Sequence, residues 1–62
     1  MTFEQIIALI LSLAPQGILL TQEILKLIQE ISNVINGLPA ELQKPVANVL
    51  AKALVTKTQS GA

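Results

Sequence analysis

Four glutamates are the only acidic side chains that this sequence offers for acid–base chemistry. General acid–base catalysis needs a titratable group that is tuned by burial or by its neighbours. Glu23 and Glu30 are seven residues apart, a spacing that places them on one helix face at about 10 Å from each other. The carboxylate pairs of glycosidases are closer than this. We therefore predict solvated surface glutamates, and no catalytic residue.

The remaining residue types do not support nucleophilic catalysis, a metal site or a cofactor site. The three serines have no histidine to activate them, and the chain contains neither His nor Cys. Metal sites with nitrogen or sulfur ligands are therefore excluded, and four separated glutamates do not form an oxygen cage. The three glycines are isolated, so no phosphate-binding loop is present. We expect a non-enzymatic protein without cofactor, metal or small-molecule substrate.

Nucleic acid is a poor match to the charge of this chain. Phosphate contacts require concentrated positive charge, whereas this chain has four basic residues, all lysines, and a formal net charge of zero. Single-strand binding uses stacking aromatic side chains, and Phe3 is the only aromatic residue. We expect no nucleic-acid partner.

The composition points instead to association. The chain has 62 residues, of which 52% are hydrophobic and only 13% are charged, and its mean hydropathy is +0.64. A domain of this size is marginally stable unless disulfides, metals or self-association support it. Without Cys or His, self-association or docking is the remaining route. We predict an all-α fold in which two to three helices form a helical hairpin or small bundle that completes its core by oligomerisation or docking.

The first helix is expected over residues 3–14. Thr2 and Gln5 have the spacing of a capping box, and the residues that follow are apolar on nearly every side, as in a helix that is buried or lies in lipid. After this helix, Ala14 to Gly17 match a type I turn with proline at its second position. A kinked but continuous helix is the competing interpretation, because the apolar residues keep the same helical spacing on both sides of Pro15.

The second helix, about residues 18–36, carries the clearest pattern. Apolar residues recur at alternating spacings of three and four, as in the core positions of a coiled coil. A third row of apolar residues along the helix makes this face wider than the contact surface of a two-stranded coiled coil. Polar residues occupy the opposite face. We predict that Gly37 ends this helix in the left-handed conformation. The predicted packing and oligomer stripe comprises Leu20, Ile24, Leu27, Ile28, Ile31, Val34, Ile35 and Leu38.

The third helix is expected over residues 39–55, with Pro39 at its first position. Pro45 either kinks this helix or marks the start of its main part. Its predicted apolar face comprises Leu42, Val46, Val49, Leu50, Ala53 and Leu54. Residues 1–55 then form a single helical module, and the polar residues 56–62 form a C-terminal tail that is expected to be an extended arm.

The apolar N-terminal segment leaves two interpretations of function open. Residues 6–20 could enter a membrane, but a span needs about 20 predominantly apolar residues, and no basic cluster or aromatic belt flanks this segment. An acidic residue stands where a secretory signal would carry a basic region, so no signal peptide is predicted. The segment that is expected to face either protein or lipid comprises Ile6, Ile7, Ile10, Leu11 and Leu13.

We favour the interpretation as a structural subunit of a multi-chain assembly, in which the chain binds copies of itself, a larger protein assembly, or both. The internal Pro45 and the irregular tail are typical of a natural rather than an idealised sequence. A bacteriophage virion is the favoured setting, although no residue pattern identifies it. The alternative is a membrane-associated peptide that acts as an anchor, a holin-like protein or a pore-forming protein.

Overall fold

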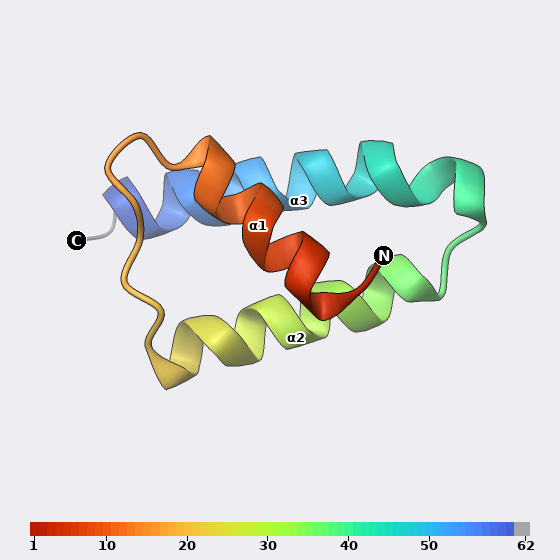
Figure 1. Cartoon of the computed structure of the whole chain (residues 1–62), viewed down its shortest axis with the longest axis horizontal. Helices are drawn as coiled ribbons and strands as arrows, with labels where there is room; N and C mark the ends of the chain where they lie inside the picture. The colour runs from red at the N-terminus through yellow and green to blue at the C-terminus, as the bar shows by residue number, and fades with distance from the viewer. Residues whose placement is uncertain (61–62) are drawn as a thin grey trace.

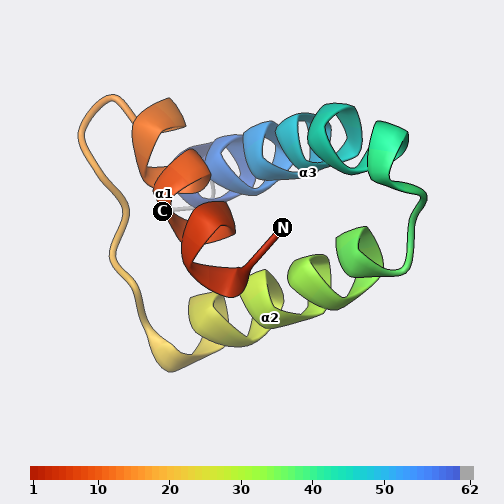
Figure 2. The ribbon, with the colours of Figure 1, turned by 45° about the vertical axis from the view of Figure 1, so that its right-hand side comes forward.

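Three α-helices make up the computed structural model, which describes residues 1–60 without the side chain of Ser60. They are α1 (Phe3–Leu13), α2 (Gln22–Asn36) and α3 (Ala40–Ser60). Helices α2 and α3 run antiparallel, and α1 lies across one side of the pair (Figure 1). Figure 2 shows the same arrangement from a turned viewpoint. The predicted all-α fold of two to three helices is confirmed, and the number of helices in the described residues is three.

The start and end of α1 follow the local sequence. The Thr2 hydroxyl accepts a hydrogen bond from the Gln5 amide at 3.1 Å, and the Gln5 side chain accepts one from the Thr2 amide at 2.8 Å, so the predicted capping box is present. Ala14 is extended, and the Gly17 amide donates to the Ala14 carbonyl at 3.3 Å. The chain therefore turns after α1 instead of continuing as a kinked helix. Gly17 has a φ of 76°, a conformation that favours glycine.

Helix α2 begins four residues later than the heptad pattern predicts. Thr21 is its N-cap, and the Thr21 hydroxyl accepts from the Ile24 amide at 3.2 Å. Residues 18–20 belong to the linker between α1 and α2. Apolar residues continue in phase through this linker, so periodicity alone could not separate it from the helix. The cap decides the boundary, because its hydroxyl satisfies an amide that has no partner within the helix.

The connection between α2 and α3 corrects two local predictions. Gly37 has a φ of −83°, so α2 does not end in a left-handed residue. The Gly37 amide instead donates to the carbonyls of Asn33 and Val34 at 3.2 Å, and the Leu38 amide donates to that of Ile35 at 3.0 Å. Pro39 precedes α3 instead of occupying its first helical position.

Helix α3 is longer than predicted at its C-terminal end. It runs through Pro45 and includes residues 56–60, which were expected to be an extended arm. The sequence between residues 46 and 60 contains no glycine or proline to end the helix. The Thr58 hydroxyl donates back to the carbonyls of Leu54 and Val55 at 2.9 and 3.0 Å. Residues 61 and 62 of the predicted tail lie outside the described part of the chain.

The core combines large residues from α1 and α2 with mostly small residues from α3. Alanines on α3 leave room for α1, which contacts α3 more extensively than it contacts α2. The predicted apolar face of α3 differs from the observed one, because only Leu54 of its members is buried. The buried apolar residues are Ile6, Ile10, Ala14, Ile28, Ile35, Ala47, Ala51, Leu54 and Val55.

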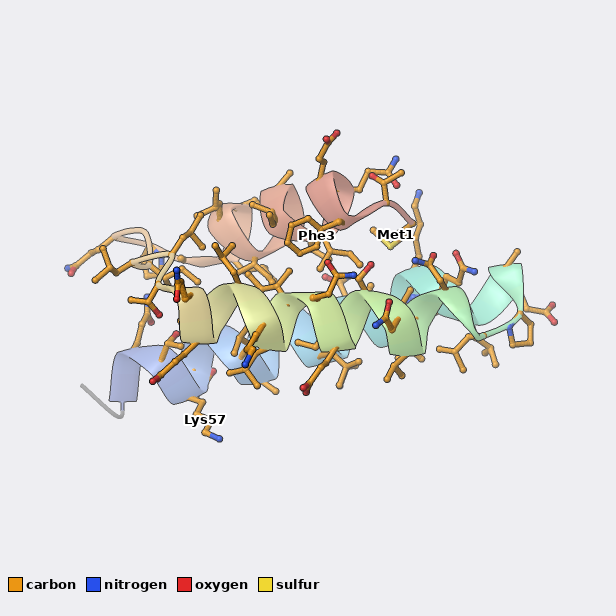
Figure 3. All side chains as sticks on the ribbon, turned by 90° about the horizontal axis from the view of Figure 1, so that it is seen from below. Met1, Phe3 and Lys57 are labelled. Carbon is orange, nitrogen blue, oxygen red and sulfur yellow. The ribbon has the colours of Figure 1, made fainter. Side chains whose placement is uncertain are left out.

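Polar contacts fix the N-terminal end of α1 over the α2–α3 connection. The Met1 ammonium group donates to Asn36 Oδ1 and to Gln43 Oε1, both at 2.9 Å. Gln43 Nε2 donates to the Leu38 carbonyl at 3.1 Å. Met1 therefore connects all three helices at this end of the molecule (Figure 3).

Candidate interaction surface

The side chains that could carry chemistry are dispersed over the surface. All four glutamates are exposed. Within residues 1–60, no three His, Cys, Asp or Glu side chains gather where they could hold a metal ion. The Ser12 hydroxyl donates to the Leu9 carbonyl at 2.7 Å, within its own helix. The side chain of Ser60 lies outside the described residues.

Ser32 is the one buried polar side chain of the described residues, at 2% exposure. Its hydroxyl oxygen accepts a hydrogen bond from Asn36 Nδ2 at 3.4 Å, so the buried oxygen has a partner. From the sequence, Ser32 was expected only to be a serine without an activating histidine, and its place in the core was not predicted. The available signal was its spacing, because Ser32 follows Leu25 by seven residues and so shares the flank of the apolar stripe on which Leu25 lies.

The predicted stripe of α2 divides into residues inside the three-helix unit and residues outside it. Ile28 and Ile35 are completely buried between the helices. Ile24, Ile31 and Leu38 are half-buried, whereas three leucine and valine residues that repeat every seven positions are exposed. These exposed members are Leu20 at 37%, Leu27 at 38% and Val34 at 57%.

The predicted buried or membrane segment mostly faces the other two helices. Ile6 and Ile10 are completely buried, Ile7 and Leu13 are half-buried, and Leu11 is 40% exposed. Over residues 1–60, none of the helices combines the length and the apolar character that crossing a membrane requires.

One apolar surface lies on the side of the α2–α3 pair that faces away from α1. We call it the back face. On α2, Leu27 lies two positions from both Leu25 and Gln29, which line the α1 side, and two positions correspond to about 200° around a helix. On α3, the apolar residues of this face lie within an arc of about 100° around the helix axis, turned away from the buried Ala51. The back face comprises Leu27, Ile31 and Val34 of α2 with Leu42, Val46, Val49, Leu50 and Ala53 of α3.

A groove of about 870 Å³ continues the back face at the end where the α1–α2 linker crosses. Ile24 and Leu27 of α2, Leu54 of α3 and residues 15–19 of the linker line this groove, together with Glu23 of α2 and Lys57 of α3. The side chain of Lys57 points away from α1 (Figure 3). The groove therefore has an acidic side on α2 and a basic side on α3.

A second hollow, of about 550 Å³, lies between α1 and α2 and shares Glu23 with the first groove, so this glutamate lies at the edge between the two. Phe3 lies over α2 there (Figure 3), and the other lining residues are mostly polar or charged: Gln22, Glu23, Leu25, Lys26 and Gln29. The single aromatic ring packs within the protomer and leaves the back face purely aliphatic.

The residues of the back face allow it to exclude water and to bind another apolar surface. Aliphatic side chains dominate it, and its charged groups lie exposed beside the apolar strip. Searches with this chain found no matching protein-family model, no matching curated protein and no matching solved structure.

Proposed function

We propose that this protein is a non-enzymatic structural subunit, built into a multi-chain assembly through its exposed apolar surface. The observation that carries the proposal is the back face, where Leu27, Val34, Leu42 and Val49 are between 38% and 66% exposed. Contiguous apolar patches of this kind are typical of interaction sites on soluble proteins.

The energetics support association. Burying apolar surface contributes about 25 cal/mol per Å², and a chain of this size has little core of its own to draw on. The formal net charge of zero provides little electrostatic repulsion between copies. An assembly that covers the back face would supply the apolar burial that one protomer lacks.

The test is light scattering on a sizing column, with the untagged chain run in plain buffer and again in mild detergent. A discrete helical oligomer in plain buffer is the expected result. A stable monomer at about 100 µM in plain buffer would contradict the proposal, because oligomers with micromolar affinity form at that concentration.

A membrane-associated role is the competing outcome of the same experiment. A chain that aggregates in buffer but becomes a single monodisperse species in detergent would favour lipid as the cover of the apolar surface. Circular dichroism of both samples would show whether the helices are intact, so that aggregation of an unfolded chain is recognised as such.

A further inference from the structure

The back face carries opposite charges at one end of two antiparallel helices. Glu23 of α2 and Lys57 of α3 line the same groove, so they lie at the same height along the helix pair. Both side chains are exposed. An antiparallel pair with this pattern is complementary to a copy of itself, because rotation by a half turn exchanges the acidic and the basic side.

We propose that a second copy of this chain covers the back face, with a twofold axis parallel to the helices. This inference rests on the proposed assembly function and specifies its partner and geometry. In this arrangement α2 of each protomer lies over α3 of its partner, and the four helices form a bundle layer with an α1 on each outer side. Glu23 then faces the partner's Lys57, and the same contact occurs twice by symmetry.

Charge selects this axis over the alternative. A twofold axis perpendicular to the helices would place α2 over a reversed copy of α2. Glu23, in the first turn of α2, would then lie opposite the last turn of the partner's α2, which holds no basic residue. The parallel axis instead pairs unlike charges and lets the aliphatic side chains of the two back faces meet.

The dimensions of the molecule set the scale of this interface. The molecule measures 34 × 20 × 17 Å, and Figure 1 looks down the shortest of these dimensions. The two longer dimensions enclose roughly 680 Å², which is an upper bound on the projected area of the back face, whereas each partner buries about 800 Å² in a standard-sized interface. The proposed dimer interface is therefore among the smaller ones.

The first experiment introduces a negative charge on the back face, at residues that the protomer leaves exposed. Val34→Glu and Val49→Glu should each raise the dimer dissociation constant at least about 100-fold, because an unpaired carboxylate would be buried between the copies. Leu11→Glu is the matched control: Leu11 is 40% exposed but lies on α1, so the dimer should persist. Sedimentation velocity gives the dissociation constants, and circular dichroism checks that each variant is folded.

The second experiment tests the axis by a charge-reversal cycle. Glu23→Lys and Lys57→Glu should each weaken the dimer about tenfold, and the double variant should restore the wild-type dissociation constant. Glu41→Lys and Lys52→Glu are the controls. Glu41, like Glu23, is the acidic residue in the first turn of its helix, so the first control reproduces the change in helix-end electrostatics without touching the back face.

The outcomes separate this inference from the proposed function. If the wild-type chain is an oligomer that Val34→Glu and Val49→Glu leave intact, the back face is not the interface and this inference fails, although the assembly function stands. If those variants dissociate but the double charge reversal does not restore binding, the proposed axis is wrong. If the wild-type chain is monomeric, the proposed function itself fails.

Discussion

Ile28 and Val34 lie six positions apart on α2, yet Ile28 is completely buried and Val34 is 57% exposed. Both belong to the predicted stripe, and their side chains have similar hydrophobicity. Their environments differ because α1 and α3 pack over one flank of the stripe and leave the other open. A substitution at Ile28 therefore reports on protomer folding, whereas a substitution at Val34 reports on the exposed surface.

We predict that Ile28→Ala lowers the free energy of unfolding by about 2–5 kcal/mol, the usual cost of a large-to-small change in a packed core. Leu19→Ala is the control, because Leu19 is 81% exposed and should change stability by less than about 0.5 kcal/mol. Urea titration followed by circular dichroism measures both values. Equal stabilities of the two variants would contradict the core assignment.

Because Ile28 is completely buried, a charged substitution such as Ile28→Asp cannot serve as a test of assembly. A carboxylate at this position would be enclosed between the three helices, where an unpaired charge is strongly unfavourable. Loss of an oligomer in that variant would therefore reflect unfolding of the protomer. Exposed positions of the back face are needed to separate association from folding.

At the scale of the elements, Thr21 determines where α2 begins. Its hydroxyl accepts from the Ile24 amide, and removing an N-cap hydroxyl costs about 0.5–2 kcal/mol. We predict that Thr21→Ala destabilises the protein by that amount, whereas Thr21→Ser, which keeps the hydroxyl, is close to wild type. Chemical denaturation measures the difference. A Thr21→Ala variant as stable as wild type would contradict the assignment of this cap.

Pro45 is the irregular residue of α3. It lies within the helix and is exposed, and it has no amide hydrogen to donate to the carbonyl of Glu41, four residues earlier. We predict that Pro45→Ala stabilises the protein by about 1–2 kcal/mol, because the restored hydrogen bond and the removed steric clash outweigh the greater freedom of the unfolded chain.

Thermal unfolding by circular dichroism tests this expectation, with Lys44→Ala as the control in the same turn. A lower Tm for Pro45→Ala would show that the proline is favoured at this position, for instance through contacts that its ring makes.

At the scale of the whole molecule, the proposed self-association predicts that stability depends on protein concentration. A partner that binds only the folded chain raises the apparent stability by mass action. We expect the Tm of the wild-type chain to rise with concentration from about 1 to 100 µM, a range that spans typical micromolar affinities. The Tm of Val49→Glu should stay constant over that range, and a constant Tm for both proteins would argue against the assembly.

The sequence was sufficient for features that depend on nearby residues. The capping box at Thr2, the turn after Ala14 and the existence of three helices follow from hydrogen-bonding groups and spacings a few positions apart, and each is present in the structure. The start of α2 was misplaced, because apolar periodicity extends through the linker and outweighed the local capping signal at Thr21. The helical residues 56–60 were missed because they have no apolar period, although nothing in them ends a helix.

The choice of apolar residues that form the core depends on how the three helices pack, and it could not be predicted from periodicity. On α3, the predicted face contained the large side chains, yet the buried positions include Ala47 and Ala51, because α1 packs closely against small residues. Larger residues such as Leu42 and Val49 are left on the back face. Periodicity measures how apolar residues are distributed around one helix, but the packing of its neighbours determines which side of that helix they cover. The composition of this chain therefore shows that it has more apolar surface than it can bury, whereas the packing of the three helices sets where that surface lies.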